Sequence, residues 1–266
     1  MKLSFSTLGC PGWSWDEIIV AARDLGYDGI EIRGIGRELY APKAKPFLAA
    51  NIKATQVNLK KTGIQISCLT SGSLLNDKDN IAKNIEEAMD YIDLASTIGV
   101  PYVRVLGDTN PQPSDVELNL VIENLKKVAN YALSKNVTAL IETNGIFADS
   151  KAMLSLLEKV DSAGVGVLWD VHHTYRYFNE SVNDTYGRIG KYIKHVHIKD
   201  SKVEDGKTVY KMMGYGDVPI CEAMGVLDKN GFDGFISLEW VKRWNLELEE
   251  PGVVFAHFIN YMKDCL

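Results

Sequence analysis

The stretch Leu25-Gly26-Tyr27-Asp28-Gly29-Ile30-Glu31-Ile32-Arg33 contains a local pattern that recurs along the whole chain of 266 residues. In each copy, an amphipathic segment ends at Gly or Asn, and a short run rich in Val and Ile follows. Glycine or asparagine supplies the left-handed residue that ends a helix, and runs of about six β-branched residues suit buried parallel strands. The copies cover residues 25–33, 62–69, 98–106, 135–142, 163–170, 190–198 and 230–239.

Together with an opening strand from Leu3 to Leu8, these copies predict eight strands that alternate with helices. Such a series is typical of a single α/β domain, a (β/α)8 TIM barrel over residues 1–266, with its site at the C-terminal ends of strands five to eight. A doubly wound open sheet is the alternative, but no G-x-G-x-x-G follows the first strand, and residues 34–36 contain only two glycines. Helices are expected at residues 15–25, 81–98, 116–134, 151–160 and 253–263.

Composition excludes several classes of protein. With 46% hydrophobic and 24% charged residues the chain is an ordinary folded protein. Its 29 Lys and Arg against 35 Asp and Glu disfavour a nucleic-acid partner. No apolar run reaches the roughly 18 residues needed to span a membrane. Residues 9–12 interrupt the N-terminal stretch too early for the hydrophobic region of a secretory signal peptide. The four widely spaced cysteines (Cys10, Cys68, Cys221 and Cys265) are expected to be reduced thiols of a cytoplasmic protein.

Polar side chains stand at the ends of four consecutive predicted strands. Glu142 ends the run ALIE, Asp170 ends VLWD, His197 lies in HVHI and Glu239 ends ISLE. A barrel gathers these strand ends at its active site, and a carboxylate buried there without a partner is costly. Each residue alone is more often a helix cap or an ion-pair member. The set of four predicts one divalent metal ion, with Mn2+, Mg2+ or Co2+ favoured and Zn2+ as an alternative.

Three further side chains belong to the same neighbourhood. His173 is expected on the loop beyond strand six. His195 precedes the metal histidine by two residues, which places it on the same side of the strand as a supporting or core histidine. Lys199 continues this alternation and is a candidate to stabilise an oxyanion. A salt bridge from this lysine to Asp200 or Glu239 is the alternative.

The first half of the barrel supplies candidate substrate contacts. Glu31 and Arg33 share one face of strand two, and Arg104 lies within strand four. A buried Glu–Arg pair is expected for Glu31. The two arginines are candidates to bind a substrate hydroxyl, carboxylate or phosphate. Four tryptophans in the flanking loops either form an apolar wall for a sugar or seal the barrel: Trp13, Trp15, Trp240 and Trp244.

These residues resemble those of the xylose isomerase-like TIM barrels, the superfamily of sugar phosphate isomerases, epimerases and endonuclease IV. The motifs that carry the resemblance span essentially the whole chain: LGYDGIEIR at 25–33, ALIETN at 139–144, WDVHH at 169–173, HVHIKD at 195–200 and FISLEW at 235–240. The resemblance implies that Glu142, Asp170, His197 and Glu239 hold the metal. It also implies that His173 contacts the substrate.

The chain departs from two branches of that superfamily. Ketohexose 3-epimerases carry an arginine where this chain has Val203 and a glutamate where it has Ala148. The resemblance therefore argues against an epimerase of D-psicose or D-tagatose. Endonuclease IV assembles three zinc ions with many histidines, whereas this whole chain holds five histidines.

The predicted function is a metal-dependent isomerase or epimerase of a ketose or keto-cyclitol, working by proton transfer through a metal-stabilised enediolate. Glu142 and Glu239 are the predicted proton-transfer pair, with Lys199 at the oxyanion and His173, Arg33, Arg104 and Trp13 on the substrate. An inosose or dehydroshikimate dehydratase and a non-catalytic sugar-binding barrel are the alternatives. The expected partner is a sugar or polyol, with no nucleic acid and no membrane, and a homo-oligomer is left open.

Overall fold

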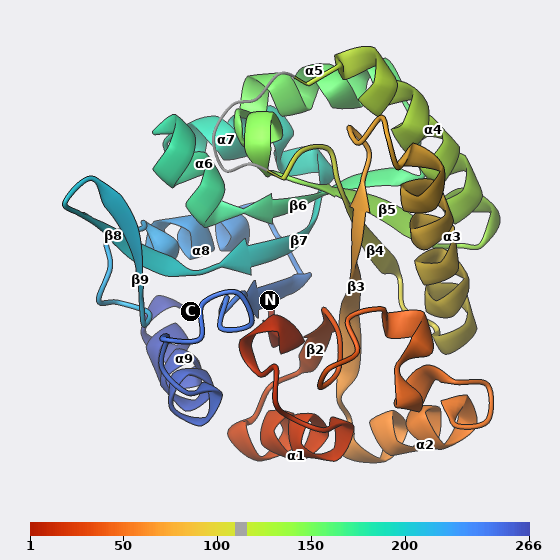
Figure 1. The fold of residues 1–266 in the computed structure, drawn as a ribbon. Helices are drawn as coiled ribbons and strands as arrows, with labels where there is room; N and C mark the ends of the chain where they lie inside the picture. Colours follow the sequence, from red (N-terminus) through yellow and green to blue (C-terminus); the bar gives the residue numbers. More distant parts are fainter. Residues whose placement is uncertain (110–115) are drawn as a thin grey trace. The chain divides into compact units, whose positions relative to one another are not determined.

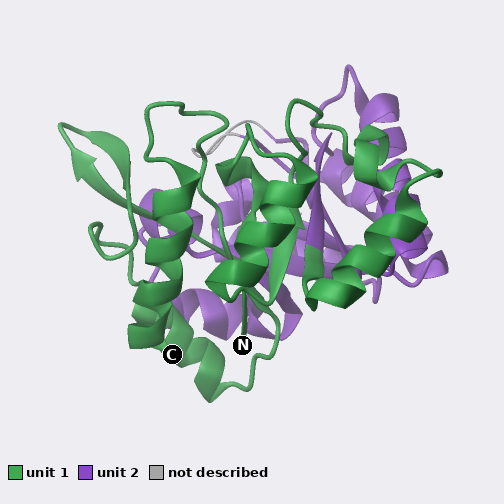
Figure 2. Ribbon diagram, turned by 90° about the horizontal axis from the view of Figure 1, so that it is seen from below, with its two compact units in different colours: residues 1–67, 196–266 green, residues 68–195 purple. Residues whose placement is uncertain are grey.

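The computed structural model of the chain describes residues 1–109 and 116–266. Within these residues, eight parallel strands follow the order β1-β10-β7-β6-β5-β4-β3-β2 and close into a barrel. Helices alternate with the strands along the chain (Figure 1). The predicted TIM barrel is therefore confirmed, and the open sheet is excluded. The chain divides into two compact units, residues 1–67 with 196–266 (unit 1) and residues 68–195 (unit 2) (Figure 2).

Unit 1 contains both ends of the chain. In its sheet, β1 pairs with β10 on one side and with β2 on the other. A second, antiparallel ribbon is formed by β8 and β9. Its elements are β1 (Lys2–Ser6), α1 (Trp15–Leu25), β2 (Gly29–Ile32), α2 (Ile52–Thr62), the part of β7 from Val196 on, β8 (Asp200–Glu204), β9 (Lys207–Lys211), α8 (Ile220–Lys229), β10 (Phe235–Leu238) and α9 (Pro251–Cys265), with short 3-10 helices at Thr7–Gly9, Ala41–Lys43 and Lys45–Phe47.

Helix α1 shows how the recurring pattern becomes structure. Ser14 and Glu17 form a capping box at its start, and Gly26 adopts the left-handed conformation at its end. The chain then turns into β2. Aromatic side chains pack beneath, where Phe5 stacks on Phe255 with ring centroids 4.1 Å apart and the Tyr27 hydroxyl donates to the Phe255 carbonyl at 2.8 Å.

Unit 2 is one continuous stretch of chain. Its strands pair in parallel, β3 with β4, β4 with β5 and β5 with β6. Helices α3 and α5 match the expected bounds to within one residue, and α4 starts at Leu118. Its elements are β3 (Gln65–Leu74, from Cys68 on), α3 (Ile81–Ile98), β4 (Tyr102–Leu106), α4 (Leu118–Ser134), β5 (Thr138–Glu142), α5 (Ser150–Val160), β6 (Val165–Asp170), α6 (Val171–Phe178), α7 (Val182–Ile189) and the start of β7 (Ile193–Ile198), with 3-10 helices at Gly145–Ala148 and Gly190–Tyr192.

Two of the differences from the expected elements have a clear local cause. The opening strand ends at Ser6 and not at Leu8, because the Ser6 side chain caps a 3-10 turn over the next three residues. His173 was expected on a loop but lies in helix α6, because the Asp170 side chain accepts from the His173 backbone N–H and starts that helix at once.

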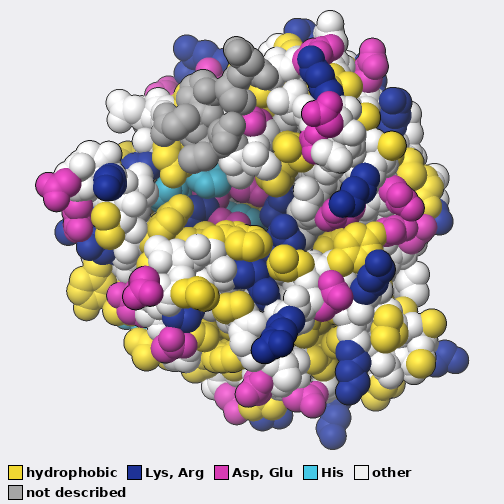
Figure 3. All heavy atoms as spheres, viewed as in Figure 1, with side chains coloured by type: hydrophobic (Ala, Val, Ile, Leu, Met, Phe, Trp, Pro, Cys, Tyr) yellow, Lys and Arg dark blue, Asp and Glu magenta, His cyan; other side chains and the backbone are white. Residues whose placement is uncertain are grey.

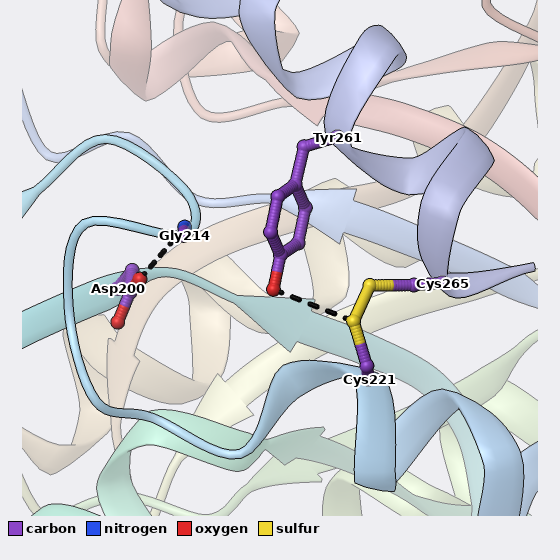
Figure 4. The surroundings of a disulfide bond; sticks show 5 residues. All are labelled: Asp200, Gly214, Cys221, Tyr261 and Cys265. Atoms are coloured by element: carbon purple, nitrogen blue, oxygen red, sulfur yellow. Dashed lines mark hydrogen bonds between the residues drawn. A yellow bond between two sulfur atoms is a disulfide. The ribbon is translucent and has the colours of Figure 1, made fainter.

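The cysteine prediction was half right. Cys10 and Cys68 are free and buried, and burial raises the pKa of the Cys10 thiol far above its usual range. Cys221 and Cys265, however, form a disulfide between α8 and the end of α9 (Figure 4). The fold brings their Cα atoms to 4.8 Å although 44 positions separate them in sequence. The expectation of four reduced thiols was therefore wrong for this pair.

Charged side chains of both signs are interspersed on the face drawn in Figure 3. None of the described helices is both long and apolar enough to span a bilayer.

Candidate active site

In unit 2, the predicted site residues form a polar layer above an apolar one. Cys68 of β3, Leu140 of β5 and Leu168 of β6 form a buried cluster, against which Tyr102 of β4 packs. Two positions further along their strands come Thr70, Glu142 and Asp170, which share that face because strand side chains alternate. Arg104 lies opposite Leu140 in the β4–β5 register and joins the polar layer. The strand period therefore puts Arg104, Glu142 and Asp170 on one face, with Arg104 in the middle of β4 and the two carboxylates at the last residues of β5 and β6.

The Arg104 guanidinium binds two groups of the protein itself. Its Nε lies 3.1 Å from Glu142 Oε2, and its Nη1 donates to the Ser71 carbonyl at 2.8 Å. Both members of this ion pair are buried. A buried carboxylate is costly without such a partner, so Arg104 compensates the charge of Glu142 and fixes its position. The buried Glu–Arg pair expected for Glu31 is thus formed by Glu142.

His173 links the two carboxylates of unit 2. Its Nδ1 lies 2.9 Å from the Thr143 carbonyl, 3.5 Å from Asp170 Oδ2 and 3.7 Å from Glu142 Oε1. A carbonyl oxygen only accepts, so Nδ1 carries a proton. Asp170 is held in turn by its backbone, whose N–H donates to Thr143 Oγ1 at 2.7 Å.

His172 is a buried histidine that sequence reasoning left out. Ligand atoms of Asp170, His172 and His173 all lie within 4.8 Å of one another. Carboxylate and imidazole donors at such spacing are able to hold a divalent ion. The His-His dipeptide directly after a strand-end Asp was the available signal. Sequence alone did not show that α6 starts there, which brings His172 close to Asp170.

In unit 1, His197 is the centre of a second buried group. Its Nε2 lies 2.6 Å from Glu31 Oε2, and its Nδ1 lies 3.5 Å from Glu239 Oε1. A carboxylate only accepts, so Nε2 of a neutral ring donates to Glu31 and Nδ1 keeps its lone pair on the side of Glu239. Glu31, expected to pair with an arginine, is therefore the carboxylate that orients His197. Metal-ligating histidines usually have such a partner on their second nitrogen.

Lys199 forms the salt bridge that was the alternative for this residue. Its Nζ donates to Glu239 Oε2 at 2.5 Å, and only 1% of the lysine is exposed. Backbone pairing holds the two strands together here, since the Glu239 N–H donates to the Ile198 carbonyl at 3.0 Å. One oxygen of Glu239 therefore faces an ammonium group and the other faces an imidazole.

These donors fit a divalent ion. Two ligands of one ion, each about 2.0–2.2 Å from it, stand roughly 3 Å apart, and the separation between His197 Nδ1 and Glu239 Oε1 is 3.5 Å. Lys199 neutralises the other oxygen of Glu239 without occupying this one. The donor atoms are the hard oxygens and imidazole nitrogen that Mn2+, Mg2+, Co2+ and Zn2+ accept.

The other predicted substrate contacts, Arg33 and Trp13, pack against aromatic side chains. Arg33 is half-buried and lies over the ring of Trp244, 5.9 Å from its centroid. Trp13 packs edge-on against Phe255. Trp240 is buried and donates to the Glu249 carbonyl, so it seals the fold. Trp15 lines a cavity of about 590 Å³ together with residues of α2 and the loop before it.

Comparison with known proteins agrees with this architecture. Fructoselysine 3-epimerase of Shigella flexneri is 24% identical over 262 residues, which cover 94% of this chain and 93% of that protein. The probable 3-DHS dehydratase AsbF of Bacillus anthracis superposes with a TM-score of 0.82, at 18% identity and 99% coverage of both chains. D-allulose 3-epimerase of Methylomonas sp. superposes at 0.78, with 16% identity and coverage of 100% and 98%.

A barrel protein of Mycobacterium smegmatis, solved in complex with magnesium, superposes with a TM-score of 0.75 at 18% identity, covering 99% of this chain and 96% of that one. The prediction of an isomerase or epimerase is supported by the names of the relatives. The family model for the xylose isomerase-like TIM barrel matches residues 19–265. The chain therefore belongs to the family of xylose isomerase-like TIM barrels.

Proposed function

We propose that this protein is a divalent-metal-dependent isomerase or epimerase of a sugar, a ketose or keto-cyclitol. Glu142, Asp170, His197 and Glu239 would hold the ion, which we expect to be Mn2+, Mg2+ or Co2+, with Zn2+ as the alternative. The observation that carries the proposal is the orientation of His197, whose Nδ1 faces Glu239 while Glu31 engages Nε2. The closed barrel supports the proposal as well, because enzymes with this fold have their active sites at the C-terminal ends of the strands.

The substrate class is drawn from relatives. Fructoselysine 3-epimerase and D-allulose 3-epimerase are named for epimerisation at carbon 3 of sugar-derived compounds. Carbon 3 of a 2-ketose lies next to the carbonyl group, so an epimerase that acts there would remove and return the proton on that carbon. We therefore favour proton transfer on a small sugar or polyol.

When bound, the ion polarises the substrate carbonyl and the neighbouring hydroxyl. Glu142 and Glu239 then remove and return the proton, which general base and acid carboxylates do when they reach the same carbon. Arg104 keeps Glu142 in place. Lys199, beside Glu239, supplies positive charge for the oxyanion. His173 presents Nε2 to a substrate hydroxyl because its Nδ1 is bound to a carbonyl.

The cellular location is not part of this proposal. A disulfide such as Cys221–Cys265 is rare in the cytosol of mesophiles, so the expectation of a cytoplasmic protein loses the support that four reduced thiols would have given it.

The test is deuterium incorporation. Protein loaded with Mn2+ or Co2+ is incubated in D2O with ketoses, inososes and hydroxy-keto acids. The mass of each compound is then measured by mass spectrometry. We expect a gain of one mass unit with the wild type and with Glu38→Gln, a control at an exposed glutamate, but none with Glu142→Gln or Glu239→Gln. Loss of water from the compound would identify a dehydratase. Deuterium incorporation that persists in both Glu→Gln variants contradicts the proposal. So does the absence of incorporation in the wild type when metal is shown to be bound.

A further inference from the structure

Asp200 directly follows Lys199 and is one of the most heavily hydrogen-bonded carboxylates of unit 1. Only 2% of it is exposed. Its Oδ1 accepts from the backbone N–H groups of Ser201 and Val218, at 2.8 and 3.3 Å. Its Oδ2 accepts from those of Gly214 and Gly216, at 2.9 and 2.8 Å. Three of these four donors come from one loop, residues 212–219, which connects β9 to α8.

The loop is shaped to fit this carboxylate. A Cβ atom on Gly216 would overlap Asp200 Oδ1, so that no other residue leaves the carboxylate in place. Gly214 has a φ of +84°, which favours glycine, and a Cβ there would lie 2.8 Å from the ring of Tyr261. The glycines therefore allow the backbone to approach Asp200 on one side and α9 on the other.

Helix α9 holds the other side of the loop. His257 Nε2 lies 2.7 Å from the Met213 carbonyl, and the Tyr261 hydroxyl lies 3.5 Å from Cys221 Sγ of the disulfide (Figure 4). Burial, and secondarily the charge of Asp200, raise the pKa of Tyr261, so this phenol stays neutral beside the carboxylate. Loop 212–219 thus contacts Asp200 on one side and helix α9, which the disulfide links to α8, on the other.

We propose that Asp200 is a positioning residue, which fixes loop 212–219 against the start of β8 and thereby holds Lys199 at Glu239. The catalytic use of Lys199 rests on the proposed function, but its placement does not. The peptide group between Lys199 and Asp200 is shared, so any release of the Asp200 side chain frees the backbone that carries the lysine. Four amide donors on one buried carboxylate make that release unfavourable in the native protein.

The experiment measures the reactivity of Lys199. The metal-free protein is treated briefly with acetic anhydride, and the acetylation rate of each lysine is measured by peptide mass spectrometry. Lys242 is the matched internal control, because it is buried in unit 1 and donates to the Leu246 and Leu248 carbonyls, away from the loop. Asp200→Asn places an NH2 group against two N–H donors, and Gly216→Ala displaces the carboxylate by a methyl group. Gly225→Ala is the control glycine variant, since a Cβ there meets nothing within 4 Å.

In both test variants we expect Lys199 to react about tenfold faster or more, with Lys242 unchanged, because only the local structure opens. The Gly225→Ala variant should match the wild type. A Lys199 rate within about twofold of the wild type in both folded variants would overturn the inference. So would a parallel rise of Lys242 in both variants, because Asp200 would then support unit 1 as a whole. Neither result depends on deuterium exchange by the wild type, so failure of this inference is distinguishable from failure of the proposed function.

Discussion

Replacing Glu31 by Gln should weaken metal binding without removing any ligand. The Glu31 carboxylate lies 2.6 Å from His197 Nε2, and both side chains are almost completely buried. Because a carboxylate only accepts, it keeps a proton on Nε2, and in the neutral ring that a metal ion requires, the lone pair then lies on Nδ1, toward Glu239. A glutamine amide is able to donate to Nε2 instead, and the ring proton then moves to Nδ1, the nitrogen we propose as ligand.

The size of the effect follows from the role of Glu31. Changing the carboxylate partner of a metal-ligating histidine costs about 10- to 100-fold in metal affinity, or about 1.4 to 2.8 kcal/mol. Calorimetric titration of the metal-free protein with Mn2+ at a fixed pH measures this directly, since ligand protonation makes metal affinity depend on pH. Glu38→Gln, at an exposed glutamate in the segment that follows β2, is the control. A Glu31→Gln protein that is folded and binds Mn2+ within about twofold of the wild type would refute the role of Glu31 in orienting His197.

Three further outcomes concern stability. Reduction of Cys221–Cys265, or replacement of both cysteines by Ser, should lower the free energy of unfolding measured in urea by about 2–4 kcal/mol, because the bond closes a loop of 44 positions. Reductant should leave the stability of the double variant unchanged. Arg104→Met should cost about 3–5 kcal/mol in the same assay, since it leaves Glu142 buried without its cation, and a loss below about 1 kcal/mol would show another compensating partner. Burial raises the pKa of Tyr27 well above its usual value, so its neutral form stabilises the fold below the unfolded pKa near 10 and this contribution is lost as the pH rises. Tyr27→Phe should therefore be less stable at pH 7 by about 1 kcal/mol and lose less stability than the wild type above about pH 10. Equal alkaline losses in both proteins would contradict that assignment.

The barrel could be predicted because its signal is local. Each helix end and the strand after it are encoded within about ten residues, as Gly26 and residues 29–32 illustrate. The strand ends followed from the same pattern: Glu142 and Asp170 are the last residues of their strands, as predicted, and Glu239 directly follows β10.

Pairings between distant residues could not be predicted in this way. Glu31 meets His197 across 166 positions, and nothing in the sequence near Glu31 distinguishes that partner from an arginine. The disulfide depends on how α8 and α9 pack, and the ribbon of β8 and β9 is an insertion into the repeating pattern. In each case the deciding contact is tertiary, whereas periodicity reports only which face of an element is buried.

The division of unit 1 between the two ends of the chain has a consequence for synthesis on the ribosome. Strand β1 needs β10 on one side, in the register Lys2 with Phe235, and those partners are translated more than two hundred residues apart. At a translation rate of roughly 5–20 residues per second, β10 is synthesised about 10 to 50 s after β1. All of residues 68–195 are synthesised within that interval. A nascent or truncated chain that ends between residues 196 and 234 therefore contains every residue of unit 2 but keeps an open strand edge in unit 1. Aggregation of such a fragment should start at that edge.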